Sequence, residues 1–275
     1  MDKVKPLLNT AALVLRLALA FAGIAYGQQS NAERLRLNPG SAVTLSQARN
    51  PQVIQTNSNV AGSAVGMAFG RYLAWLHERN PFTDGGPIAV EIEASLPSRG
   101  KRGHLLAIRQ IGASERSEYL VLRVEGDSTV KQQVIARYLA AQEQAEALPY
   151  SSVAITPGNY RFRYASSIDT DGTIVYVFQI TPKKKRVGLI QGELWIDSAT
   201  GIGVRQVGVF VKRPSVFIRR IEILRDTNLD DRLPSVRVTH VSIETRMVGR
   251  AELTITERAL VTADREAASH YEKGD

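Results

Sequence analysis

Residues 176–206 read YVFQITPKKKRVGLIQGELWIDSATGIGVRQ, and this stretch decides the fold class. Its start belongs to an apolar run, Ile174 to Ile180, which a short basic segment joins to a second β-rich run, Val187 to Ile196. Turn residues at 197–201 precede a third run, Val204 to Val211. Short β-rich runs joined by such turn chemistry indicate hairpins. The stretch therefore predicts consecutive antiparallel strands.

The basic segment between the first two strands has two interpretations that agree with the rest of the sequence. Its cations are Lys183, Lys184, Lys185 and Arg186. A solvated hairpin tip is the simpler interpretation, because so few residues join the strands. Contact of the four side chains with an anionic membrane surface is the functional alternative. Neither nuclear import nor a nucleic-acid partner is expected.

Further strands are predicted on both sides of this stretch. Ile88, Val90 and Ile92 alternate with Glu91 and Glu93, which is the period-2 pattern of a sheet with one wet face. The other predicted strands cover residues 104–111, 119–124, 160–164, 216–224, 236–247 and 250–260. The total is about ten antiparallel strands.

Two amphipathic helices are predicted to cover the apolar face of this sheet. The first runs from Gly66 to Asn80, with apolar residues spaced at i, i+3, i+4 and i+7. The second follows the cap Asp127–Thr129 and carries an apolar stripe from Val130 to Leu148. The expected fold class is α+β, with a curved antiparallel sheet and two covering helices.

The N-terminal residues are typical of a secretory signal peptide. Charged residues up to Arg16 precede the apolar run Leu17 to Ile24 and the small-residue site Ala25-Tyr26-Gly27. An uncleaved anchor is the alternative, but the run is shorter than the roughly 20 residues that span a bilayer. We therefore expect a signal peptide over 1–27, a disordered or loosely ordered leader over 28–65, a folded domain over 66–262 and a flexible tail over 263–275.

Composition agrees with export. The 275 residues include no cysteine, so the fold has no disulfides and the cleavage site has no cysteine to lipidate. The net charge of +8 favours anionic surfaces such as phospholipid headgroups. The expected location is a bacterial periplasm.

A family resemblance follows from the quoted stretch. Ile180-Thr181-Pro182, a strand ending in Trp195-Ile196-Asp197, then Thr200-Gly201 and Val204-Arg205 make the chain similar to the LolA-like group of periplasmic proteins. The group includes lipoprotein carriers. The resemblance implies an incomplete β-barrel whose apolar face is covered by helices, with acyl chains or lipids held between them. A lipid or a lipoprotein acyl chain is then the implied partner.

The sequence shows no catalytic or metal-binding pattern. No Gly-x-Ser-x-Gly elbow is present, and His77, His104, His240 and His270 are scattered. Residues 169–172 resemble the start of a calcium loop, but a hairpin turn explains them better. The aspartates at 226, 230 and 231 are expected in an exposed connection. No enzymatic activity, cofactor or metal is therefore expected.

Aromatic residues on successive strands and on the second helix are the candidate ligand-binding residues. The candidate apolar lining consists of Tyr138, Phe162, Tyr176, Phe178, Trp195, Phe210 and Phe217. The alternative is that these rings only fill the core. The expected function is non-enzymatic binding of a lipid, acyl chain or lipoprotein between sheet and helices. The rival is an envelope adaptor or sensor with a filled core that binds another protein.

Overall fold

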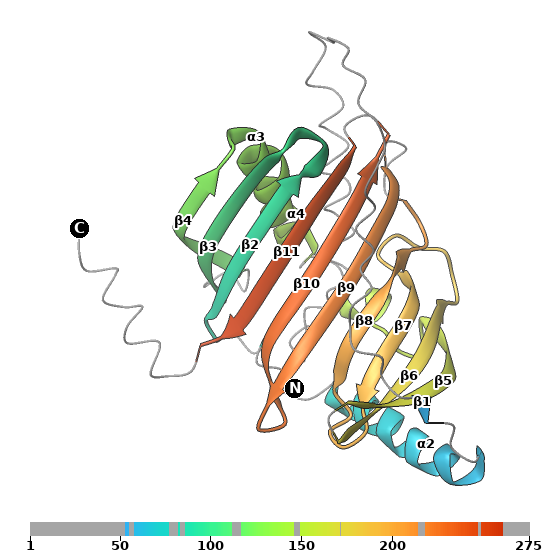
Figure 1. The fold of residues 1–275 in the computed structure, drawn as a ribbon. Coiled ribbons are helices and arrows are strands. Elements are labelled where there is room, and N and C mark those ends of the chain that lie inside the picture. The colour runs from blue at the N-terminus through green and yellow to red at the C-terminus, as the bar shows by residue number, and fades with distance from the viewer. Residues whose placement is uncertain are drawn as a thin grey trace.

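The structure is a computed structural model, which describes residues 53–54, 58–76, 82, 86–111, 117–145, 149–170, 172–213, 218–246 and 249–260. These residues form one sheet of eleven strands, antiparallel at every pairing (Figure 1). The strands are β1 (Val53–Ile54), β2 (Ile88–Leu96), β3 (Lys101–Ile111), β4 (Ser117–Gly126), β5 (Tyr160–Thr170), β6 (Thr173–Pro182), β7 (Ile190–Asp197), β8 (Gly203–Phe210), β9 (Ile218–Asp230), β10 (Leu233–Thr245) and β11 (Arg250–Ala259).

Two meanders make up the sheet. The order across it is β1-β5-β6-β7-β8-β9-β10-β11-β2-β3-β4, so β5 to β11 are neighbours in chain order and β2 to β4 form a second run. The pairing of β11 with β2 joins the two runs. The prediction of an antiparallel sheet of about ten strands with covering helices is confirmed.

One face of the sheet can be followed from strand to strand by register. Directly paired residues point to the same side. The row that crosses nine strands consists of Phe162, Ile180, Gly192, Gly208, Ile223, Val241, Leu253, Ala94 and Gly103. We call the side of this row the inner face and the opposite side the outer face.

Both long helical segments lie on the inner face (Figure 1). One is α2 (Ser58–Trp75), whose Phe69 ring lies 4.8 Å from the ring of Phe162 between centroids. The other is the continuous segment formed by α3 (Ser128–Val130), the π-helical turn η3 (Lys131–Ile135) and α4 (Ala136–Ala145). A Cβ on Gly103 would lie 3.0 Å from Cγ1 of Val130, so this helix sits directly on β3.

The start of the second helix agrees with its predicted cap. Oδ1 of Asp127 accepts hydrogen bonds from the backbone N–H groups of Thr129 at 2.8 Å and Val130 at 3.3 Å. These are donors that the first turn of a helix otherwise leaves unpaired. Val130, Val134 and Tyr138 of the predicted stripe are buried, and Ile135, which was not part of that stripe, is buried as well. The π-helical turn at 131–135 was not predicted.

The short helices and turns complete the structure. They are the 3-10 turn η2 (Pro97–Arg99) between β2 and β3, and α5 (Tyr150–Val153) before β5. None of the helices in the described ranges combines the length and the apolar composition needed to cross a bilayer.

Two predicted boundaries are corrected. The first helix begins at Ser58 instead of Gly66, and β1 pairs with β5 inside the range expected to be a loose leader. A domain boundary at residue 66 is therefore too late. The remainder of 28–65, the predicted signal peptide over 1–27 and the predicted tail over 263–275 lie outside the described residues.

The aspartates expected in an exposed connection belong mainly to a strand. β9 continues to Asp230, and only Asp231 and Arg232 form the turn into β10. Both turn residues have positive φ, 46° and 64°, as a two-residue hairpin turn with the right-handed twist of its strands requires. Asp226 therefore lies within the sheet.

Candidate binding face

The inner face beside α2 is built from aromatic rings. The Phe69 ring of α2 lies 5.3 Å from the ring of Phe178 on β6, and the ring of Tyr164 on β5 lies 6.0 Å from Phe178. Tyr72 of α2 is buried, and its hydroxyl donates to the carbonyl of Ile155 at 3.0 Å. Edge and tilted contacts at these separations are the favoured arrangements of aromatic pairs.

Most of the predicted lining residues lie on this face. Phe162, Tyr176 and Phe178 point inward from β5 and β6, because their cross-strand partners belong to the inner face. Phe210 pairs with buried Ile190 one row away, and Tyr138 is buried on α4. Phe217 lies outside the described residues.

Trp195 is a correction, because the structure places it on the outer face. Its neighbours Leu194 and Ile196 point inward, and alternate residues of a strand point to opposite sides. Its indole Nε1–H donates to Oε2 of Glu193 at 3.0 Å, and the guanidinium of Arg205 lies 4.9 Å from the ring centroid. Trp195 therefore covers the outer surface of the sheet instead of lining the inner face.

The basic segment 183–186 forms the connection between β6 and β7, as the hairpin-tip interpretation expects. All four cations are exposed. Asn159 holds the base of the connection: its carbonyl accepts from the N–H of Lys183 at 2.8 Å, and its Oδ1 accepts from Nη2 of Arg186 at 3.0 Å. Lys184 and Lys185 extend beyond this anchor. Contact of the four cations with an anionic surface stays a prediction.

A cluster of buried charges on the inner face was not predicted from the sequence. It consists of Arg109 on β3, Arg225 on β9, Arg237 on β10 and Glu257 on β11. We call these four residues the arginine cluster. The side chains of Arg109, Arg237 and Glu257 are 11%, 12% and 10% exposed, and Arg225 as a residue is 6% exposed.

The carboxylate lies between two of the three guanidinium groups. Nη1 of Arg109 donates to Oε1 of Glu257 at 2.8 Å, and Nη1 of Arg237 lies 3.6 Å from Oε2. Phe82 covers both arginines: its carbonyl accepts from Nη2 of Arg109 at 3.0 Å, and its ring centroid is 4.2 Å from the Arg237 guanidinium. Cation–π contact is an established way to accommodate a desolvated guanidinium.

Within the described part of the chain, two donors of the cluster have no hydrogen-bond partner. Nε of Arg225 donates to Oγ1 of Thr239 at 3.1 Å, but its Nη2 has no hydrogen-bond partner, and Nε of Arg237 also has none. A buried donor without an acceptor costs roughly 1–3 kcal/mol, and more when it is charged. Most buried polar groups in proteins are paired, so these two atoms require an explanation.

The pKa values of the cluster follow from burial and from an unequal number of charges. Burial, and then the charge of Arg237, lowers the pKa of Arg225 to about 9. Burial also lowers the pKa of Arg237. Burial alone would raise the pKa of Glu257, but the charges of Arg109, Arg237 and Arg225 hold it below its ordinary value. The cluster therefore carries three cations and one anion at neutral pH.

A sequence signal for the cluster did exist. Ala251, Leu253 and Ile255 alternate on the inner side of β11, and the same period continued to Glu257 places its carboxylate on that side. Arg225 was assigned to the loop after the predicted strand 216–224, whereas β9 continues through it to Asp230, and this hid its inward position. Extending the strand 216–224 to its turn would have placed Arg225 on a strand as well, but only the pairing of the strands brings the four charges together.

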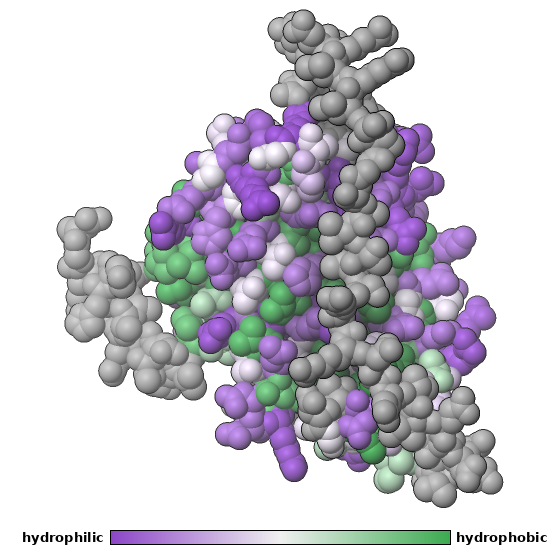
Figure 2. Space-filling model, in the orientation of Figure 1, coloured by the Kyte–Doolittle hydropathy of each residue, from purple (hydrophilic) through white to green (hydrophobic). Residues whose placement is uncertain are grey.

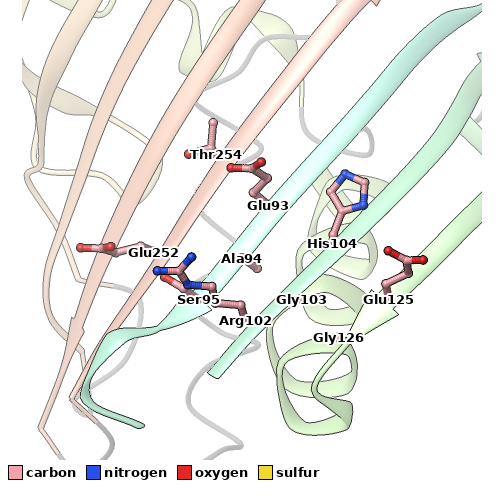
Figure 3. Close-up of a pocket in the computed structure, with 10 residues that line it drawn as sticks. All are labelled: Glu93, Ala94, Ser95, Arg102, Gly103, His104, Glu125, Gly126, Glu252 and Thr254. Carbon is pink, nitrogen blue, oxygen red and sulfur yellow. The ribbon is translucent and has the colours of Figure 1, made fainter. Parts of the chain in front are cut away.

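The outer face carries a shallow polar groove of about 560 Å³ (Figure 3). Its side chains come from β2, β3, β4 and β11, and they include His104 together with Glu93, Glu125 and Glu252 (Figure 3). His104 Nε2 lies 2.8 Å from Oε1 of Glu91. In the part of the chain that the structure describes, no three His, Asp or Glu side chains gather as metal ligands.

His240 is the other histidine that the structure describes. Nδ1 of His240 lies 3.1 Å from Oγ1 of Thr254 on the outer face. His77 and His270 lie outside the described residues.

Comparison with known proteins adds a similarity of fold. No family model matches the chain, and no curated protein matches it. Among solved structures, the chain is similar to the crystal structure of a LolA superfamily protein from Nitrosomonas europaea, at 14% identity and a TM-score of 0.29, over 66% of this chain and 88% of that chain. At these values the similarity carries no argument about function.

Proposed function

We propose that this protein is a non-enzymatic binder of an amphiphile, such as a lipid or the acyl chain of a lipoprotein, held between the inner face of the sheet and its helices. The observation that carries the proposal is the continuous inner face itself. Its rows run across the sheet with α2 over one end and the α3–α4 segment over the other. Transfer of an acyl chain onto such a face is driven by about 0.8 kcal/mol per methylene removed from water.

The test uses two partly buried aromatic residues on opposite faces. Phe162→Ala removes a ring from the inner face, whereas Trp195→Ala removes one from the outer face. Binding of a pyrene-labelled fatty acid should weaken in the first variant and stay unchanged in the second. Lipid extracted from the purified protein and identified by mass spectrometry gives an independent readout. Wild-type protein that neither carries lipid nor binds the probe contradicts the proposal.

We further propose that the protein acts in the periplasm after export. The support is the sequence of residues 1–27 and the absence of cysteine from the chain. Attachment of a reporter enzyme that is active only outside the cytoplasm to Leu260 tests this proposal. A reporter that stays inactive contradicts it.

A second candidate function, binding of another protein through a sheet edge, is favoured by a specific feature of β4. This strand ends the strand order, and Leu120, Val121, Leu122 and Val124 on it are 38–48% exposed. Hydrophobic residues gather at the side of the molecule where Figure 1 places β4 (Figure 2). An open strand edge can pair with a strand of a partner.

A further inference from the structure

We propose that Arg225 and Arg237 form an anion-binding site on the inner face, which recognises a carboxylate or phosphate group. The inference deepens the proposed function and rests on it in one respect: the anion is the polar end of the bound amphiphile. The site itself depends on the arginine cluster alone.

The arginine cluster carries an excess of positive charge. Three guanidinium groups face one carboxylate in a region where every member is at least four-fifths removed from water. Buried charges in proteins are paired or bound to a counter-ion, because an isolated buried charge is strongly unfavourable. Glu257 contacts Arg109 and Arg237, and among the residues that the structure describes Arg225 has no anionic partner within hydrogen-bond distance. One further anion would neutralise the excess charge.

The unused donors belong to two arginines on neighbouring strands. Arg225 pairs directly with Thr239, and Thr239 is two residues from Arg237 on the same strand. The two arginines are therefore diagonal neighbours on one face, a relationship that places Cβ atoms about 7–8 Å apart or somewhat closer. The unpartnered atoms are Nη2 of Arg225 and Nε of Arg237. An anion with two oxygens can accept from both.

The guanidinium donors indicate the chemical class of the ligand. Guanidinium groups match the geometry of carboxylate and phosphate oxygens, and such hydrogen bonds are stronger than those between neutral groups. The same row as Arg225 continues through Gln206 and Leu194 to Phe178, so an apolar surface begins two strands away. A ligand with an anionic end and an apolar chain fits this arrangement, with its anionic end at the arginines and its chain along the apolar side chains.

The first experiment compares two probes with the same apolar chain, one with an anionic end and one with a neutral end. Wild-type protein should bind a pyrene-labelled fatty acid more tightly than the methyl ester of the same acid. Arg225→Met or Arg237→Met should weaken binding of the acid by roughly ten- to hundredfold and leave binding of the ester within about twofold. Arg205→Met is the matched control, because Arg205 pairs with Asp226 on the outer face.

The second experiment uses inorganic phosphate alone, at constant ionic strength. A site in the folded protein predicts a Tm that rises with phosphate concentration in the wild type and in Arg205→Met. The rise should be absent from Arg225→Met. If Arg225→Met does not fold, Arg225→Lys and Arg237→Met provide the same comparison, because each removes one of the two proposed donors.

The outcomes separate this inference from the proposed function. Equal binding of acid and ester, with no stabilisation by phosphate, overturns the anion site and leaves amphiphile binding standing. Binding of neither pyrene probe overturns amphiphile binding. In that case the phosphate result alone decides: stabilisation that is lost in Arg225→Met supports the site for a free anion, and its absence overturns the site. Stabilisation by phosphate that survives in every variant also overturns it.

Discussion

Arg109 and Glu257 form an ion pair at 2.8 Å although 148 positions of sequence separate them. Arg109 lies on β3 and Glu257 on β11, so the pair reaches across β2 and links the two meanders of the sheet. Both side chains are almost fully buried, at 11% and 10% exposure. The contribution of this pair to stability therefore depends on the removal of both charges from water.

Removal of the carboxylate should strongly destabilise the protein. Glu257→Gln keeps the volume of the side chain but leaves three buried guanidinium groups without an anion. The expected loss in the free energy of unfolding is about 3–5 kcal/mol, measured by urea denaturation. Glu252→Gln on the same strand is the control: its pair with Arg250 is 45–48% exposed, and the expected loss is below about 1 kcal/mol. Equal losses in the two variants would contradict the role of burial.

The same carboxylate predicts a pH dependence with a definite sign. Its folded-state pKa is held below the ordinary value of 4.5, so its stabilisation is complete above about pH 4.5 and is lost as the pH falls through the folded-state pKa. The difference in unfolding free energy between wild type and Glu257→Gln should therefore shrink as the solution is acidified below pH 4.5. A difference that stays constant down to complete acid unfolding would show that Glu257 is not charged in the folded protein.

The docking of α2 can be tested at the turn between β7 and β8. Gly201 has φ of +77°, and a Cβ there would lie 2.4 Å from Cβ of Arg71 on α2. Gly201→Ala should combine backbone strain with overpacking of about 1–3 kcal/mol. Gly172→Ala isolates the strain, because Gly172 has φ of +81° and no atom within 4 Å of the added Cβ. Thermal denaturation should give Gly201→Ala the lower Tm of the two.

The hydroxyl of Tyr160 should stabilise the start of β7. Tyr160 is 1% exposed, and its hydroxyl oxygen accepts a hydrogen bond from the N–H of Ile190 at 3.2 Å. Tyr160→Phe leaves that buried N–H without an acceptor, for an expected cost of roughly 1–3 kcal/mol. Tyr164→Phe is the control, since Tyr164 is 37% exposed. Hydrogen exchange at Ile190 should accelerate in Tyr160→Phe alone.

The edge strand predicts the result of a charge substitution. Leu122→Lys on β4 should change the free energy of unfolding by less than about 0.5 kcal/mol, because Leu122 is 47% exposed. It should reduce association through the edge, since a lysine there opposes strand pairing. Light scattering during size-exclusion chromatography measures the association. Ile174→Lys is the control, because Ile174 is 41% exposed but lies on β6, and this substitution should not change the association.

The strands and the second helix were predictable because their signals are local. The alternation of Ile88 to Glu93 gives a strand, and Asp127 gives a helix start, wherever they are placed in the fold. Pairings between distant strands have no local signal. The neighbours of β2, for example, are β3 and β11, and only the first is close in sequence.

The candidate site was predictable only for its apolar part. Phe162 and Phe178 were chosen because aromatic residues recur on successive strands, and both lie on the inner face. The assignment of Trp195 to that face was wrong. β7 carries large side chains on both of its faces, so an aromatic residue alone does not indicate which face it occupies. The arginine cluster depends on four registers at once, so no single segment could reveal it.

The pairing of β11 with β2 has a consequence for how the chain reaches this structure. β11 follows all the other strands along the chain, yet it lies inside the sheet, with β10 on one side and β2 on the other. Closing so long a loop is entropically costly and makes folding slow. Until residues 250–259 emerge during synthesis, β10 and β2 each present an open edge that invites mispairing. A nascent chain would therefore benefit from a holding chaperone until its last strand arrives.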